Sequence, residues 1–237
     1  MSARVALLRM ERDGLITLPP ARPANFNVPI PRFTEPIPEL QFELPVHLEA
    51  LGQIQLNIVK TKAHLLRWRN LISSYHYLGH VPFAGAQLRY LIECSYGTLG
   101  ALGFAASAWK CAPRDIHIGW DSGTREARLQ LVVGNARFLI LPHVRIQNFA
   151  SYILSRVTKR LPDDWKITYG YEPVLLETFV ESNRFSGASY KAANWIYVGQ
   201  TKGRGKLDRY NERALPVKDI YLYPLRKDYK RILTEPI

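Results

Sequence analysis

The chain has 237 residues, of which 47% are hydrophobic and 22% are charged. This composition is typical of a globular protein and excludes disorder along the whole length. The 32 Lys and Arg residues outnumber the 20 Asp and Glu residues, which gives a net charge of +12. Such a surplus favours a polyanionic partner, and DNA is the partner that we expect.

The sequence shows no sign of membrane insertion or export. No apolar run approaches the ~18 residues that a transmembrane helix needs, and the first ten residues lack the apolar core of a signal peptide. The two cysteines, Cys94 and Cys111, are too few for a disulfide framework. We therefore expect a cytoplasmic protein without a membrane partner.

The first 18 residues resemble the end of a winged helix-turn-helix. Val5 and Leu8 lie on one face of an expected helix, Gly14 is a typical helix stop, and residues 15–18 alternate like a short strand. The sequence contains no earlier helices of such a module, so residues 1–18 are interpreted as a remnant. The alternative is an amphipathic helix that packs on the main body.

Residues 19–45 hold eight of the sixteen prolines and predict an extended linker. After this linker, residues 46–237 predict one α/β or α+β domain, a mixed twisted sheet with flanking helices. Helices are expected over 46–79, 148–159 and 189–196, with a turn at 163–165. Apolar or alternating runs predict the strands, at 87–95, 99–109, 116–120, 129–133, 138–144, 173–180 and 219–225.

Several stretches follow one another in a characteristic order between residues 70 and 225. They are YHYLG (75–79), QLRYL (87–91), NARFLILP (135–142), LLETFV (175–180), AANW (192–195) and GQTKGRG (199–205). This combination resembles the DruA family, the DruA component of Druantia anti-phage systems and its relatives near mobile elements. The resemblance implies a role in phage defence or in a mobile element, and a helicase or another defence-system protein as a partner.

The segment 145–150 is similar to the pantetheine loop of the GNAT acyltransferases. That loop reads Arg or Gln, two residues, Gly, any residue, then Gly or Ala; Arg145 and Ala150 match it, and Asn148 replaces the first Gly. The resemblance implies a GNAT-like fold. It also implies an alternative function, acyl transfer, in which backbone N–H groups at a helix start would meet the pyrophosphate of acyl-CoA.

The segment 201–206, TKGRGK, places cations between glycines. Glycines let the backbone approach a phosphate closely, and the cations neutralise it. Aromatic side chains among basic residues suit stacking on unpaired bases. The residues predicted to contact nucleic acid are Arg137, Lys191, Trp195, Lys202, Arg204 and Lys206, together with Lys60, Lys62 and Arg67 from a basic helix.

Asp115 and Glu177 are the candidate catalytic acids. Glu177 lies inside an otherwise apolar strand, where a bare carboxylate is costly. If the two acids converge, they would hold Mg²⁺ for phosphodiester chemistry, so DNA nicking or transposition is an alternative function. The simpler interpretation is a structural pair of Arg114 with Asp115, and Glu177 bonded to a neighbouring arginine. In the acyltransferase alternative, Glu177 would lie on the strand that often bears a general base.

Overall fold

The computed structural model describes residues 10–17, 44–203 and 215–235, and the chain divides into two units, Met1–Arg32 and Phe33–Ile237. In the first unit, residues 10–12 are helical. Gly14 has a φ of 72°, and the N–H of Leu15 donates to the carbonyl of Met10 at 2.8 Å, so the predicted helix stop is confirmed. Residues 15–17 form no strand, whereas the expected linker lies almost entirely outside the described residues.

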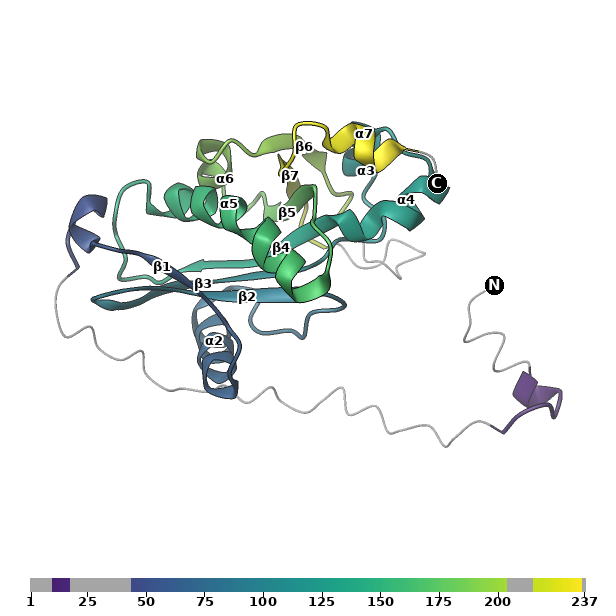
Figure 1. Cartoon of the computed structure of the whole chain (residues 1–237), viewed down its shortest axis with the longest axis horizontal. Coiled ribbons are helices and arrows are strands. Elements are labelled where there is room, and N and C mark those ends of the chain that lie inside the picture. Colours follow the sequence, from purple (N-terminus) through teal and green to yellow (C-terminus); the bar gives the residue numbers. More distant parts are fainter. Residues whose placement is uncertain (1–9, 18–43, 204–214, 236–237) are drawn as a thin grey trace. The chain divides into compact units, whose positions relative to one another are not determined.

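The described part of the second unit is built on a mixed sheet of seven strands (Figure 1). The strand order is β1-β2-β3-β4-β5-β7-β6, and only β4 and β5 pair in parallel. The strands are β1 (Gln55–Ile58), β2 (Gln87–Cys94), β3 (Gly97–Ala106), β4 (Val132–Ile140), β5 (Leu175–Glu181), β6 (Ile196–Gln200) and β7 (Lys218–Pro224). The predicted fold class is therefore confirmed.

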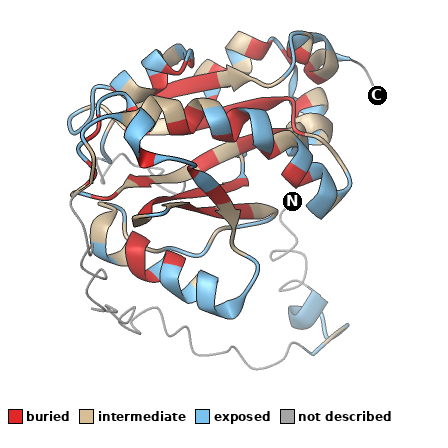
Figure 2. Cartoon of the chain, turned by 60° about the vertical axis from the view of Figure 1, so that its left-hand side comes forward, coloured by how far each residue is buried: buried red, intermediate tan, exposed pale blue. Residues whose placement is uncertain are grey.

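Helices cover both faces of this sheet. The α-helices are α2 (Lys62–Tyr75), α3 (Ala112–Ile118), α4 (Ser122–Arg128), α5 (Phe149–Tyr169), α6 (Ala188–Ala192) and α7 (Tyr229–Thr234), with short 3-10 turns η1 (Leu48–Leu51) and η2 (Leu129–Leu131). α2 lies on one face of β1–β3 and α5 on the other (Figure 1). Buried residues follow the strands and the sheet-facing sides of the helices (Figure 2). Within the described residues, no helix has the length and apolarity that crossing a bilayer requires.

α5 is longer than its sequence pattern indicates. Phe149, Ile153, Val157 and Leu161 are buried at a spacing of four residues, which places one apolar face against the sheet. The expected turn at 163–165 is wrong, because Asp164 lies within the helix. Its carboxylate accepts hydrogen bonds from the hydroxyl of Tyr90 at 3.0 Å and from Nε of Arg160 at 2.8 Å.

Two other predicted elements are also wrong. Residues 55–58 were expected in a helix but form β1, since β2 offers them an antiparallel partner strand. Residues 116–120 were expected as a strand, but most of them belong to α3 and its end at Gly119. Pro113 in the first turn favours the start of this helix, and Ile116 stays 80% exposed instead of facing the core.

Candidate functional site

A cavity of about 470 Å³ lies where β4 and β5 separate, and we name it the β4–β5 cavity. Its wall is formed by residues 75–78 after α2, 135–136 and 138–140 of β4, 178–180 of β5 and 185–190 leading into α6, together with Ala150 of α5. Most of the larger lining side chains are aromatic, namely Tyr75, Tyr77, Phe138, Phe179, Phe185 and Tyr190. A concave, ring-lined surface of this size is typical of a ligand site.

The cavity exists because the parallel pairing of β4 and β5 stops early. The ladder extends only from Val132 opposite Leu175 to Gly134 opposite Glu177. At the next residues of the two strands, Asn135 and Thr178, hydrogen bonds of side chains take the place of the backbone pairing. The hydroxyl of Thr178 donates to the carbonyl of Asn135 at 3.2 Å, and the hydroxyl of Tyr190 donates to Oδ1 of Asn135 at 2.7 Å. These bonds satisfy the buried polar groups and leave the strands apart.

A β-bulge in β4 lies beside the cavity. Gly103 of β3 pairs with Arg137 and Phe104 pairs with Asn135, so Ala136 has no partner across the ladder. Nδ2 of Asn135 donates to the carbonyl of Arg137 at 3.1 Å and to that of Gly103 at 3.3 Å, which stabilises the bulge. A bulge bends its strand and redirects the neighbouring side chains, here those of Ala136 and Arg137.

His76 is the titratable group in the cavity wall whose pKa is displaced furthest into the acid range. Burial, assisted by the charge of Arg137, lowers the pKa of His76 from 6.5 to about 4. The N–H of Leu78 donates to Nδ1 of His76 at 3.2 Å. The ring is therefore neutral near pH 7 and has its proton on Nε2, which makes this nitrogen a hydrogen-bond donor.

Two aromatic rings connect the segments at the cavity opening. The ring of Tyr77 stacks on His76 at 4.9 Å and lies 5.2 Å from the ring of Phe185. Phe185 lines the cavity and is still 45% exposed, so this contact lies at the opening. The guanidinium of Arg184 is 5.0 Å from the centroid of the Tyr77 ring, which brings a cation to the same place.

Three arginines from three elements lie around His80, and we name Arg69, Arg89 and Arg137 the arginine cluster. Their charges lower the pKa of His80, after the larger effect of burial. Arg89 and Arg137 are half-buried and lie 5.1 and 5.9 Å from the ring centroid of Phe83. Burial lowers the pKa of both guanidinium groups.

Among the residues that the structure describes, the arginine cluster has no carboxylate counter-ion. No cluster member forms an ion pair with a carboxylate of residues 10–17, 44–203 or 215–235. In the same ranges, Nε of Arg89 and Nε2 of His80 are buried without a hydrogen-bond partner. Like charges held together in a partly dry environment are unfavourable, and a bound anion would relieve that repulsion.

The arginine cluster and the β4–β5 cavity share a loop. Nε of Arg137 donates to the carbonyl of Gly79 at 3.0 Å, and so holds the segment that joins α2 to β2. That segment places His76 in the cavity wall and His80 within the field of the arginine cluster. A ligand with an anionic part and a planar apolar part matches this combination.

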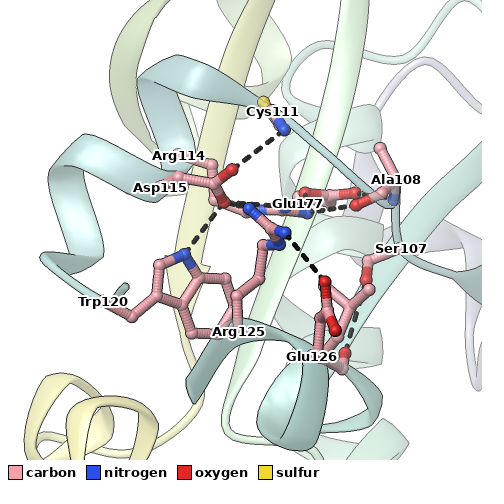
Figure 3. Close-up of polar contacts among 10 residues, drawn as sticks. Ser107, Ala108, Cys111, Arg114, Asp115, Trp120, Arg125, Glu126 and Glu177 are labelled. Carbon is pink, nitrogen blue, oxygen red and sulfur yellow. Dashed lines mark hydrogen bonds and ion pairs between the residues drawn. The ribbon is translucent and has the colours of Figure 1, made fainter. Parts of the chain in front are cut away.

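Glu177 is fully buried and belongs to a different cluster, shown in Figure 3. Its Oε2 lies 2.8 Å from Nη1 of Arg114, which is also fully buried, and its Oε1 accepts from the N–H of Ala108 at 2.7 Å. Burial raises the pKa of Glu177, whereas the Arg114 charge and the Ala108 N–H oppose that rise. Both carboxylate oxygens therefore have protein partners.

Asp115 converges on the same guanidinium. Its Oδ1 accepts from Nε of Arg114 at 2.9 Å and from Nε1 of Trp120 at 3.0 Å, and its Oδ2 accepts from the N–H of Cys111 at 3.1 Å (Figure 3). The structure thus brings Asp115 and Glu177 together, but around Arg114. No three His, Cys, Asp or Glu side chains of the described ranges are grouped to hold a metal ion. This geometry favours a structural ion-pair network.

The other residues predicted to contact nucleic acid are scattered. Lys60 and Lys62 are exposed at the start of α2, whereas the exposed Lys191 is on α6, on the other side of the sheet (Figure 1). Arg67 is occupied by an ion pair with Glu93 at 2.8 Å. Lys202 is exposed after β6, and Arg204 and Lys206 lie outside the described residues.

Trp195 needs a correction. Its side chain is 4% exposed and packs 5.1 Å from Tyr190 and 5.6 Å from Tyr223, so it belongs to the core and offers no face to a base. The reason is the strand pairing: Trp195 immediately precedes β6, which pairs with β7, and Tyr223 of β7 lies against the Trp195 ring.

Of the residues predicted to bind acyl-CoA, the structure places one in the cavity wall. Ala150 lines the β4–β5 cavity, whereas Arg145 is exposed in the loop before α5. Asn148 is the N-cap of α5 with a φ of 60°, and its side chain makes no capping hydrogen bond. It thus adopts the left-handed backbone that glycine would provide in the matching loop.

Sequence reasoning placed Arg69 on a basic helix face without counting it among the contact residues. It did not single out Arg89 and Arg184, nor the two rings Phe83 and Phe185, as site residues. Arg89 lies between the buried Leu88 and Tyr90 on an alternating strand. The alternating pattern of a strand predicts only that a cation at such a position faces solvent. Only the three-dimensional structure shows that it faces Phe83 and two other arginines.

The fold and site define a mixed α/β protein with an aromatic cavity and, in the described part of the chain, a group of arginines without carboxylate partners. The family model of the Druantia protein DruA matches residues 43–215. Because this match covers most of the chain, the chain belongs to the DruA family. No curated protein matches the chain.

Several solved acetyltransferase structures are similar to this chain. They include the spermidine/spermine N-acetyltransferase SpeG from Vibrio cholerae, with 12% identity over 76% of this chain and 96% of that chain and a TM-score of 0.46. The polyamine N-acetyltransferase of Drosophila melanogaster has 10% identity over 73% and 100% of the two chains, with a TM-score of 0.47. An N-acetyltransferase from Staphylococcus aureus has 13% identity over 74% and 100%, with a TM-score of 0.45. These likenesses concern the fold, and no activity follows from them.

Proposed function

We propose that this DruA-family protein binds nucleic acid in phage defence and that the arginine cluster contacts the phosphates. The observation behind this proposal is that Arg69, Arg89 and Arg137 have no carboxylate partner among the described residues. Most of the other described arginines with exposed side chains, such as Arg67 and Arg160, are ion-paired.

The physical argument is electrostatic. A phosphate that enters the cluster compensates mutual repulsion, and the strand releases its condensed counterions. Aromatic rings beside the cations, such as Phe83 and Tyr77, add surfaces on which bases stack. The net charge of +12 acts in the same direction by steering a polyanion to the protein.

The test measures fluorescence anisotropy of a labelled strand and a labelled duplex with the full chain, between about 50 and 200 mM salt. The double variant Arg69→Gln, Arg137→Gln removes two charges, while each glutamine amide still provides polar N–H donors. We expect its affinity to fall ~10-fold and the slope of log affinity against log salt to decrease by about 2.

The matched control is Arg226→Gln with Arg231→Gln, which also removes two charges. Both of these arginines already form ion pairs with Asp228, at 3.0 and 2.9 Å. We expect their replacement to change the affinity by less than about twofold. Equal losses in the two double variants would show that only net charge matters, and affinities independent of salt would refute phosphate binding altogether.

Acyl transfer is the second candidate function, favoured by one observation. Ala150, at the start of α5, lines the cavity that opens between β4 and β5, so a ligand there would meet the first turn of a long helix. The test is the melting temperature of the protein with saturating acetyl-CoA. A rise that disappears in Arg145→Ala would support acyl-CoA binding, and no rise in the unaltered protein would remove this candidate.

A further inference from the structure

The geometry points to the β4–β5 cavity as a pocket for one nucleobase turned out of a nucleic-acid strand. This inference rests on the proposed function, because it names the part of the strand that the cavity takes while the arginine cluster holds the backbone. Three properties of the cavity support it: its lining, the donor that His76 offers and the charge at its opening.

The lining suits a planar ring. The cavity volume of about 470 Å³ lies within the range of small-molecule sites. Rings from three separate parts of the chain line it, namely Tyr77 after α2, Phe138 on β4 and Tyr190 on α6. Every base has a π-face, and stacking on aromatic side chains is a main source of affinity for unpaired bases. A flexible aliphatic chain would gain less from such walls than a flat ring.

His76 offers the cavity a donor for the base edge. Asn135, Thr178 and Tyr190 hydrogen-bond one another at the strand separation. By contrast, Nε2 of His76 makes no hydrogen bond within the described ranges, and it has the ring proton because Nδ1 accepts from Leu78. Bases present ring nitrogens and carbonyl oxygens as acceptors, which such a donor can meet.

The charge at the opening suits the phosphates that flank a base. Arg137 lies between the lining residues Ala136 and Phe138, and Arg184 directly precedes Phe185. The side chain of Arg184 is 55% exposed, and Glu181, at 3.6 Å, is the carboxylate with which it pairs in the described part of the chain. An extruded nucleotide would therefore place its base among rings and its phosphates among arginines.

The experiment uses two alanines at the two ends of α6 as a matched pair. Ala188 lines the cavity and Ala192 does not, and both are exposed. Ala188→Trp obstructs the cavity with an indole, and Ala192→Trp adds the same indole elsewhere on the same helix. The probes are two labelled duplexes of about 20 bp, one fully paired and one with a thymine opposite an abasic site, whose base costs less to extrude.

We expect the unaltered protein to bind the abasic duplex at least ~5-fold more tightly than the paired one, as one stacked base predicts. Ala188→Trp should abolish this preference and leave affinity for the paired duplex unchanged, whereas Ala192→Trp should keep the preference. Equal affinities for both duplexes, or a preference that survives in Ala188→Trp, would overturn the base pocket and leave the proposed function standing. Failure to bind either duplex would overturn both. A thermal shift by acetyl-CoA that Ala188→Trp removes would assign the cavity to acyl-CoA instead.

Discussion

Replacing Glu177 with glutamine separates a structural from a catalytic role for the buried acids. In the structure, Glu177 neutralises Arg114, and neither side chain is exposed to solvent. Glutamine has nearly the same shape, and its carbonyl can still accept from the N–H of Ala108. Its amide, however, brings a second donor to Nη1 of Arg114, so that the buried guanidinium keeps only Asp115 as a charged partner.

The expected cost is large because removing one member of a buried pair leaves an uncompensated charge. Such changes typically destabilise a protein by ~3–5 kcal/mol. Asp115 remains 2.8 Å from Nη2 of Arg114, so we expect the lower end, about 3 kcal/mol. The double variant Arg114→Met, Glu177→Leu removes both charges, and we expect it to be more stable than Glu177→Gln.

The assay is equilibrium unfolding in urea, in which the midpoint of Glu177→Gln should fall by about 1–2 M. Glu172→Gln is the control, because its carboxylate pairs with Nζ of Lys166 at 2.6 Å and both side chains are more than one-third exposed. That surface pair should contribute less than about 1 kcal/mol. A Glu177→Gln protein of unchanged stability that loses Mg²⁺-dependent nicking of a plasmid would refute the structural interpretation and make Glu177 a catalytic acid.

Three further predictions concern the site and its surroundings. The pKa of His76 is lowered to about 4 in the folded protein, so this residue contributes stability above pH 6.5 that is lost as the pH falls towards 4. We expect a loss of about 1–2 kcal/mol over that interval, reduced by partial exposure, and a flatter pH profile of unfolding in His76→Gln. A Cβ on Gly103 would lie 2.7 Å from Phe83 and 2.9 Å from Trp68, so Gly103→Ala should destabilise the protein by about 1–3 kcal/mol, measured by thermal unfolding. Trp195→Phe should cost about 1 kcal/mol of stability and leave DNA affinity unchanged, and a selective loss of affinity would restore its predicted role in stacking.

Local sequence patterns predicted the elements that have their own periodicity. The hairpin of β2 and β3 follows from two alternating runs around Gly97, and α5 follows from apolar residues four positions apart. The failures occurred where a partner element decides the conformation. Residues 55–58 form a strand because β2 lies beside them, and Asp164 stays helical because Arg160 and Tyr90 satisfy its carboxylate.

The candidate site was less predictable, because the sequence does not show which charged residues the fold brings together as ion pairs. Arg67 and Arg69 are two residues apart on α2, and the sequence gives no reason to distinguish these two arginines. The fold brings Glu93 to Arg67 at 2.8 Å, whereas Arg69 lies in the field of Arg89 and His80. The net charge of the chain therefore predicts a polyanionic partner but not the surface that would contact it. Our proposal for that surface rests on the distribution of the carboxylates: Arg69, Arg89 and Arg137 have no acidic partner among the described residues, and an external anion would serve as their counter-ion.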